Sequence, residues 1–143
     1  MTPAQQRAWA IVQRCAQPGD DLPLVMGVIE HESSFDPDAF AIDRNGGSYG
    51  LMQLDMMTAR DRGYRGEPHG LLDPDLNVSL GMAQLRWIKT FLARNSALSV
   101  QAIAAAYNEG VGNVLRGNPD PRYVGAVLAA RTRWQIALDG APT

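Results

Sequence analysis

The sequence predicts a mainly α-helical protein of about six or seven helices, folded as one domain over residues 1–143. Apolar residues recur at helical spacing along most of the chain, and capping residues or prolines mark helix starts. No segment alternates polar and apolar residues as a strand does, so a short β-ribbon is expected only in the loop at 40–50. With 45% hydrophobic and 20% charged residues, the 143-residue chain has the composition of a globular protein with a real core.

The expected helices are recognised by their starts and stops. Pro18-Gly19, Pro37 and Gly110 are breakers, and a connection containing Gly and Pro runs over residues 63–74. Start signals are found at Thr2-Pro3, Asp20 or Asp21, Asn77, Ser99 and Pro121. The main helices are therefore expected at about residues 3–16, 22–35, 51–62, 77–94, 99–107 and 121–138, with a short turn of helix at 111–115.

Composition also excludes several classes of function. The net charge of −2 gives no basic surface for nucleic acid, and no apolar run is long enough for membrane insertion. Cys15 is the only cysteine, so no internal disulfide is possible. Neither histidines nor aspartates have the spacing of a zinc or calcium site, so we expect no metal and no other cofactor. Nothing indicates a large exposed apolar patch, which favours a monomer.

Glu32 is the most informative residue because it is a carboxylate on an apolar helix face. Val25, Val28, Ile29 and Glu32 fall on one stripe that should face the core. Burial raises the pKa of a carboxyl, and a carboxyl that is protonated near neutrality can act as a general acid. A structural glutamate bonded to backbone or arginine is an equally good interpretation of this position. Glu30 lies about 160° around the helix and is expected to be solvated, which makes it an internal control.

Two further clusters carry polar groups suited to a ligand. In SYGLMQ (48–53), Gly50 permits a tight turn or a close approach, Gln53 suits sugar hydroxyl or N-acetyl groups, and Met52 could line a sugar groove. The alternative is a helix start with Met52 in the core. In AYNEG (106–110), Tyr107 has an apolar ring and a hydroxyl able to reach Glu32 or a ligand, and Asn108 could hold a carboxyl or cap the helix.

Five segments of the chain resemble the lysozyme-like lytic transglycosylases, which share a fold with goose-type lysozymes. In order, they are HESSF (31–35), SYGLMQL (48–54), DLNVSLG (75–81), AYNEGVGNV (106–114) and YVGAV (123–127). The resemblance covers roughly residues 24–128. It implies a lysozyme-like fold and cleavage of the β-1,4 bond between N-acetylmuramic acid and N-acetylglucosamine in peptidoglycan. Glu32 would be the single acid/base, and the product would carry a 1,6-anhydromuramic end.

The resemblance also assigns supporting residues. Gln53, Tyr107 and Asn108 match substrate-contacting and glutamate-orienting positions, Ser33 follows the glutamate, and Tyr123 matches a groove tyrosine. It implies action in the bacterial cell wall or periplasm. The N-terminus lacks the basic region and apolar run of a signal peptide, so we expect a phage-encoded protein, another route of delivery, or a removed leader.

Two alternatives remain open at this point. The stretch DRNGGSYGLMQLD (43–55) also resembles goose-type lysozymes, which place an aspartate before the GLMQ motif. If Asp43 positions a water, the reaction would be hydrolysis with inversion, for which the two carboxyls should lie ~6.5–9.5 Å apart. A non-catalytic peptidoglycan-binding module, or one for secretion or phage assembly, is the alternative of another class.

Overall fold

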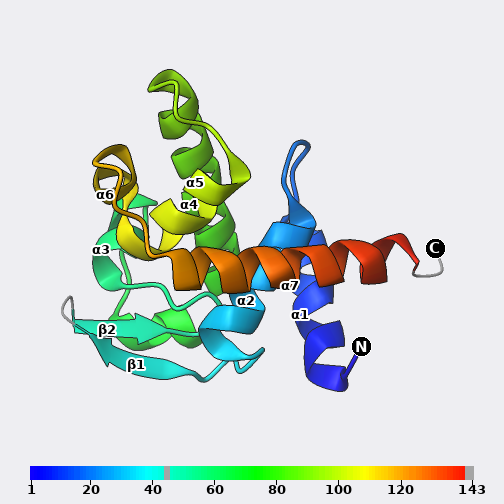
Figure 1. Cartoon of the computed structure of the whole chain (residues 1–143). Coiled ribbons are helices and arrows are strands. Elements are labelled where there is room, and N and C mark those ends of the chain that lie inside the picture. The colour runs from blue at the N-terminus through cyan, green and yellow to red at the C-terminus, as the bar shows by residue number, and fades with distance from the viewer. Residues whose placement is uncertain (44–45, 141–143) are drawn as a thin grey trace.

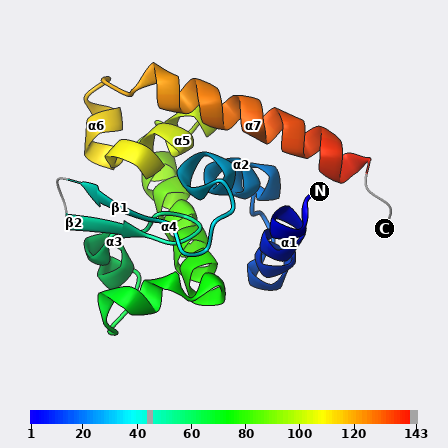
Figure 2. The ribbon, with the colours of Figure 1, turned by 90° about the horizontal axis from the view of Figure 1, so that it is seen from below.

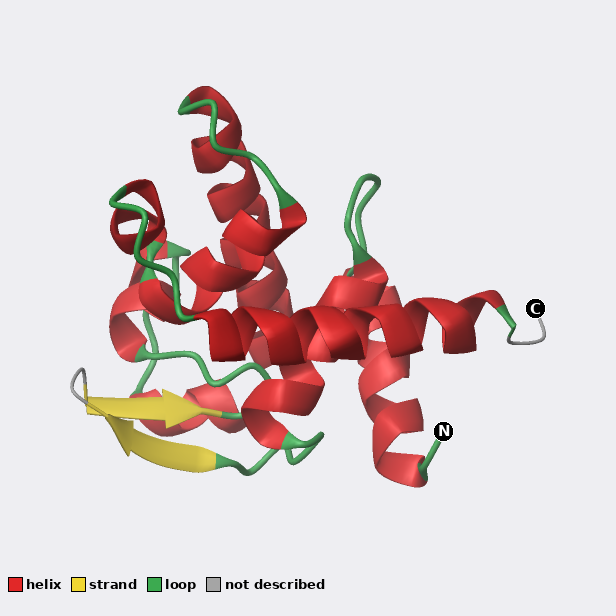
Figure 3. Cartoon of the chain, viewed as in Figure 1, coloured by secondary structure: helices red, strands yellow, loops and turns green. Residues whose placement is uncertain are grey.

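A computed structural model of the chain describes residues 1–43 and 46–140. Within these ranges lie seven α-helices, one 3-10 helix (η1) and one two-stranded antiparallel sheet, so the predicted mainly α-helical class is confirmed (Figure 3). The elements are α1 Pro3–Cys15, α2 Leu22–Ser33, β1 Phe40–Asp43, β2 Gly46–Tyr49, α3 Met56–Asp61, η1 Pro68–Leu72, α4 Pro74–Arg94, α5 Val100–Glu109, α6 Val111–Leu115 and α7 Pro121–Asp139. No helix of the described part is long and apolar enough to cross a membrane.

Helix α2 is the most enclosed element, and its apolar stripe is buried as predicted. Val25, Val28 and Ile29 are at most 2% exposed. Helix α7 crosses α2 closely (Figures 1 and 2). A Cβ on Gly27 would lie 3.0 Å from the Val127 carbonyl oxygen and 3.1 Å from the Arg131 nitrogen, so glycine allows a closer approach of α7 than a larger residue would. The last turn of α2, which carries Glu32, is thereby fixed against α7.

The hairpin, α3 and α6 gather at one end of the molecule, whereas α1 lies at the other (Figures 1 and 2). The hairpin pairs Phe40 with Tyr49 and Asp43 with Gly46 in antiparallel register. It is the β-ribbon predicted for the 40–50 loop, although residues 44–45 at its tip lie outside the described ranges. The long helix α4 connects the two ends and contacts α1, α3, α5 and α6.

Two helix starts differ from the prediction, and η1 was not predicted. Helix α3 begins at Met56 rather than Leu51, because Asp55 accepts a hydrogen bond from the Thr58 N–H at 2.7 Å and caps the helix there. Helix α4 begins at Pro74, since Asp73 is its N-cap. Asn77 therefore lies inside the first turn of α4 and is not a cap. The displaced Asn77 and the non-helical residues before Asp55 together build one wall of the site.

Candidate active site

A pocket of about 270 Å³ opens between the end of α2, the hairpin, α3, α4 and the end of α5. Its lining is mostly polar and consists of Glu32, Ala41, Asp43, Ser48, Gln53, Leu54, Asp55, Thr58, Gln84, Tyr107 and Asn108. Five of the eight predicted site residues are among them. The other three, Ser33, Met52 and Tyr123, lie behind the lining. We refer to this cavity as the Glu32 pocket.

Glu32 is largely buried at the inner end of this pocket. Burial raises the pKa of its carboxyl from 4.5 to about 7, against the opposing effect of a hydrogen bond from Tyr123. The Tyr123 hydroxyl donates to Oε2 of Glu32 at 3.3 Å. Among the described residues, no arginine or lysine forms an ion pair with Glu32. The carboxyl is therefore protonated up to about neutral pH and is not neutralised by a fixed cation, which are properties of a general acid.

Glu30 was expected to be solvated, and this expectation is wrong. Its carboxylate forms an ion pair with Arg133 at 2.7 Å and accepts a hydrogen bond from the Trp134 indole N–H at 3.2 Å. Both partners belong to α7, more than 100 residues away in the sequence. Glu30 thus joins α2 to α7 on the face of α2 away from the pocket, whereas Glu32 faces the pocket and pairs with no cation of residues 1–43 and 46–140.

The two tyrosines exchange the roles that their sequence positions indicated. Tyr107 was expected to reach Glu32 or a ligand, but its hydroxyl donates to the Met52 carbonyl oxygen at 2.6 Å. Tyr123, which was expected to be a groove tyrosine, contacts the carboxyl of Glu32 and packs edge-on against His31 at 4.8 Å between ring centroids. Burial raises the pKa of both hydroxyls, so each remains protonated and acts as a donor.

A tight turn at residues 49–54 forms the wall opposite Glu32, and Asn77 holds it in place. Gly50 has a φ of +76°, and a Cβ there would lie 2.5 Å from Asn77 Nδ2. The fully buried Asn77 accepts from the Met52 N–H at 2.8 Å and donates to the carbonyl oxygens of Tyr49 at 2.7 Å and Leu71 at 2.8 Å. Its side chain therefore supplies the partner of the Met52 N–H and the Leu71 carbonyl and adds a second donor to the Tyr49 carbonyl, which also accepts from the Leu54 N–H at 3.0 Å.

The turn fixes the positions of its own side chains. Gln53 has a φ of +51°, and its amide nitrogen donates to the carbonyl oxygens of Ala39 at 3.1 Å and Gly50 at 3.0 Å. Met52 is fully buried in the core against Gly81, as the core alternative for this residue predicts. Ser33 donates back to the Ile29 carbonyl at 3.1 Å within its own helix. Met52 and Ser33 thus support the pocket without lining it.

Asp43 lies in the same pocket as Glu32, at the end of β1. It is exposed, and its Oδ2 accepts a hydrogen bond from the Ser48 hydroxyl at 2.7 Å across the hairpin. The alternation of the strand places Ala41 and Asp43 toward the pocket, while Phe40 and Ile42 are exposed. The hairpin therefore presents a second carboxylate to the cavity.

Sequence reasoning missed four contributors. Asp55, Thr58 and Gln84 line the pocket, and Asn77 was interpreted as a helix cap. Thr58 follows Asp55 by three residues, which is the spacing between an N-cap residue and the backbone N–H that its side chain binds. A search for helix caps could therefore have found Asp55. Gln84 gives no such signal, because its role depends only on where α4 crosses the site.

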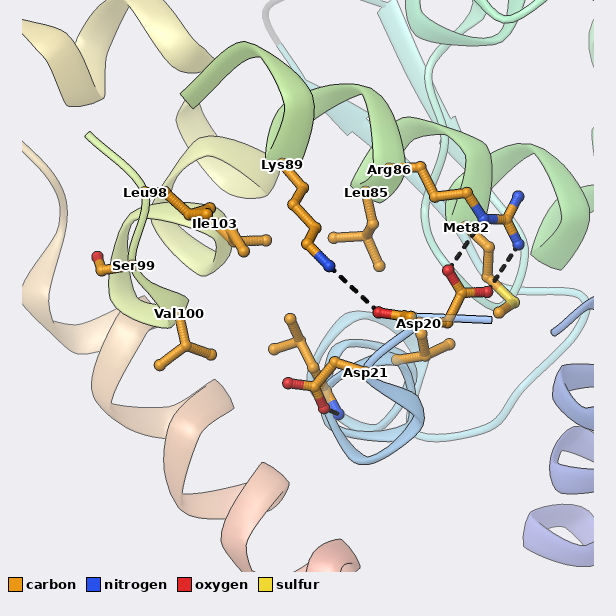
Figure 4. Close-up of a pocket in the computed structure, with 13 residues that line it drawn as sticks. Asp20, Asp21, Met82, Leu85, Arg86, Lys89, Leu98, Ser99, Val100 and Ile103 are labelled. Atoms are coloured by element: carbon orange, nitrogen blue, oxygen red, sulfur yellow. Dashed lines mark hydrogen bonds and ion pairs between the residues drawn. The ribbon is translucent and has the colours of Figure 1, made fainter. Parts of the chain in front are cut away.

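A second pocket, of about 280 Å³, lies between α2, α4 and the start of α5 and does not include Glu32 (Figure 4). Its interior is largely apolar, with Leu24, Leu85 and Ile103 among the lining residues. Arg86 at the rim binds Asp20 at 2.8 Å, and the Lys89 ammonium donates to the Gly19 carbonyl at 3.2 Å. We refer to it as the Lys89 pocket. The charged side chains of this pocket form ion pairs or hydrogen bonds with other groups of the protein, so they give no evidence of a ligand site.

Comparison with known proteins identifies the family. The family model of the transglycosylase SLT domain matches residues 10–122, and the chain belongs to this family. It is 35% identical over 108 residues to membrane-bound lytic murein transglycosylase C of Edwardsiella ictaluri and 36% identical to that of Pectobacterium atrosepticum; each alignment covers 68% of this chain and 29% of the relative. The chain thus spans less than a third of the length of these curated relatives.

A solved structure confirms the predicted lysozyme-like fold. An inactive Glu-to-Gln mutant of the lytic transglycosylase Slt from Pseudomonas aeruginosa superposes with a TM-score of 0.73 and 21% sequence identity. The match covers 96% of this chain and 25% of that one. Nearly the whole chain therefore corresponds in fold to one part of a much larger protein.

Proposed function

We propose that residues 1–143 form one catalytic domain that cleaves peptidoglycan as a lytic transglycosylase, with Glu32 as the acid/base. The observation that carries this proposal is a single buried carboxyl with a pKa raised to about 7 that faces a polar pocket. Membership of the SLT-domain family and the activity in the names of the relatives support it. A binding module alone would not need a protonated acid at the inner end of its groove.

In the proposed reaction, Glu32 first gives its proton to the oxygen that bridges N-acetylmuramic acid and N-acetylglucosamine, and this C–O bond breaks. The Glu32 carboxylate then takes the proton of the muramic 6-hydroxyl, whose oxygen bonds to its own anomeric carbon. The product has a 1,6-anhydro ring, Glu32 is protonated again, and no water is consumed. One enzymic carboxyl therefore serves both steps, unlike the usual pair of carboxylates in glycosidases.

The other predicted residues have supporting roles in this proposal. Tyr123 orients the Glu32 carboxyl through its 3.3 Å hydrogen bond. Gln53 and Asn108 contact the sugar from two sides of the pocket, and Tyr107 and Met52 hold the turn that carries Gln53. Ser33 stabilises the last turn of α2.

A second outcome is favoured by one observation, namely that Asp43 lies in the same pocket as Glu32. If Asp43 holds a water against the anomeric carbon, the bond would be hydrolysed as in goose-type lysozymes. Mass spectrometry of the muropeptides released from purified sacculi in oxygen-18 water separates the two reactions. We expect anhydro-ended products without the label; labelled reducing ends that disappear in Asp43→Asn would assign hydrolysis instead.

The same sacculi test the enzyme proposal against a non-catalytic module for binding, secretion or phage assembly. We expect the wild-type protein, acting as a monomer without membrane insertion, to clear a suspension of sacculi, and Glu32→Gln to bind without clearing. Binding without clearing by the wild type at every pH from 4 to 8 would show a binding module. The site of action would be the bacterial cell wall or periplasm, where peptidoglycan lies.

A further inference from the structure

Arg62 and Trp87 form a cationic and aromatic pair near the Glu32 pocket. The guanidinium carbon of Arg62 lies 5.0 Å from the centroid of the Trp87 ring, which is a cation–π contact. Trp87 also stacks on Phe91, with 5.3 Å between ring centroids and 27° between ring planes. Trp87 nevertheless remains 37% exposed. The arginine is therefore held in place on an aromatic surface that solvent can reach.

This pair continues the wall of the Glu32 pocket from two helices at once. Thr58 of α3 and Gln84 of α4 line the pocket. Arg62, the C-cap of α3, follows Thr58 by four residues and Trp87 follows Gln84 by three, so they lie about 6 Å and about 4.5 Å further along and on nearly the same face. Because the two side chains also contact each other, Arg62 lies one helical turn beyond the pocket, at its α3–α4 edge.

The guanidinium of Arg62 has no acceptor within the described ranges of the chain. Its Nε is buried without a hydrogen-bond partner, and the four ion pairs among these residues involve other arginines. A buried donor without an acceptor costs free energy, and no acidic residue within the described ranges pairs with the charge of this guanidinium. An arginine already fixed on a ring loses little freedom when it binds a planar anion, and its fork of N–H groups matches a carboxylate.

The charge of the pocket itself shows where an anionic part of a substrate could bind. Glu32, Asp43 and Asp55 line the pocket, and its lining includes no arginine or lysine. Such a cavity suits uncharged sugar rings and disfavours a carboxylate. Peptidoglycan combines both kinds of group, because peptides that carry carboxylates are attached to its neutral glycan strands. Arg62 supplies a cation one helical turn beyond this pocket.

We propose that Arg62, positioned by Trp87, binds a carboxylate of the peptide attached to the glycan strand. The chain therefore cleaves peptide-bearing strands in preference to bare strands. This inference rests on the proposed function and names the part of the substrate that the α3–α4 edge binds. Arg62 is the binding residue and Trp87 is a positioning residue.

The test compares two substrates, namely glycan strands with their peptides and the same strands after an amidase has removed them. We expect Arg62→Gln to raise KM for peptide-bearing strands about tenfold with little change in kcat, since one charge-assisted hydrogen-bonded pair is lost. On bare strands, Arg62→Gln should equal the wild type. Arg60→Gln is the matched control, because Arg60 is an exposed arginine of α3, the helix that Arg62 caps. It should change neither KM.

Trp87 is tested by substitution and by its emission. Trp87→Ala should raise KM for peptide-bearing strands less than Arg62→Gln does, and Trp87→Phe should restore most of the loss because a ring remains. In Glu32→Gln protein, a peptide-bearing oligosaccharide should change tryptophan emission. Trp134 is buried and Trp9 is partly buried in the core, so Trp87→Phe should remove most of this change.

The possible failures are distinguishable. Suppose that the wild type cleaves both substrates. If Arg62→Gln then lowers both rates equally, or leaves both rates unchanged, the peptide-binding role is wrong and the proposed function stands. If the wild type cleaves neither substrate, the proposed function is wrong and this inference falls with it. Melting temperatures of the variants show whether an equal loss on both substrates comes from unfolding.

Discussion

The two pockets on opposite sides of α4 have nearly the same volume, about 270 Å³ and 280 Å³, but opposite chemistry. The Glu32 pocket is lined by carboxylates and amides, and its buried acid has no ion-pair partner in the described part of the chain. The Lys89 pocket is apolar inside, and its charged rim is satisfied by Asp20 and the Gly19 carbonyl. Two successive residues of α4 line different pockets: Gln84 lines the Glu32 pocket and Leu85 lines the Lys89 pocket.

The two pockets differ in whether their polar groups have partners within the protein. The candidate active site is the pocket whose acid has no ion-pair partner within the described residues. The same distinction separates Glu30 from Glu32 within one turn of α2. Glu30 has Arg133 and Trp134 as partners and is structural, whereas the hydrogen bond of the Glu32 carboxyl within the described ranges comes from the Tyr123 hydroxyl. Burial without a cation is what raises the pKa of Glu32 into the useful range.

The largest effect should come from Glu32→Gln, which removes the acid and keeps the shape. We expect the rate of muropeptide release to fall about 10²- to 10⁴-fold, the usual contribution of a general acid/base. Lys89→Gln, in the other pocket, and Glu30→Gln should each keep the wild-type rate within about twofold. A comparable loss in Lys89→Gln would break the distinction between the two pockets.

The next effect concerns the turn that walls the Glu32 pocket. Asn77→Ala leaves the Met52 N–H and the Leu71 carbonyl without partners and removes one of two bonds to the Tyr49 carbonyl, and we expect it to lower the free energy of unfolding by about 3 kcal/mol. Asn95→Ala, at the exposed end of the same helix, removes one bond to the Phe91 carbonyl and should cost about 0.5 kcal/mol. Urea unfolding measures both. Equal costs would mean that Asn77 does not hold the turn.

The raised pKa of Glu32 should appear in both stability and activity. The folded-state pKa of about 7 lies above the ordinary 4.5, so the stabilisation by the protonated form is complete below pH 4.5 and is lost as pH rises through 7. Glu32→Gln, which does not titrate, should therefore gain up to about 3 kcal/mol over the wild type between pH 4.5 and 8. Thermal unfolding across this range measures the gain. Activity of the wild type should fall over the upper part of the same range.

The hydroxyl of Tyr123 provides a second test of the pKa of Glu32. The hydrogen bond from Tyr123 lowers the pKa of Glu32, so Tyr123→Phe should move the alkaline limb of the activity profile to higher pH. Tyr107→Phe, whose hydroxyl binds the Met52 carbonyl, should leave the limb in place while lowering stability. An unshifted profile in Tyr123→Phe would show that this hydroxyl does not act on Glu32.

The smallest effect belongs to the Lys89 pocket. Ile103→Val removes one methylene from its partly buried wall and should cost about 0.5–1 kcal/mol of stability. Because this pocket has no role in the proposed reaction, kcat and KM on sacculi should be unchanged. Guanidinium unfolding and a sacculus assay on the same sample test both statements. A change in KM would connect the Lys89 pocket to the substrate.

The sequence by itself determined what depends on neighbours along the chain. Helical periodicity located the main helices and placed Glu32 on an apolar face, since side-chain direction repeats every 3.6 residues. Caps and breakers predicted most boundaries, and five of the eight predicted site residues line one pocket. The third helix was started too early because Leu51, Met52 and Gln53 have helical propensity, yet Asn77, 25 residues away from Met52, holds them in a turn.

Only the tertiary structure decided which distant groups meet. It gave Glu30 its partners on α7, chose Tyr123 rather than Tyr107 for Glu32, and brought Arg62 onto Trp87. Each of these contacts depends on the distance and angle at which two helices cross, which local periodicity does not encode. The raised pKa of Glu32 has the same origin, because burial by packing is a property of the assembled fold.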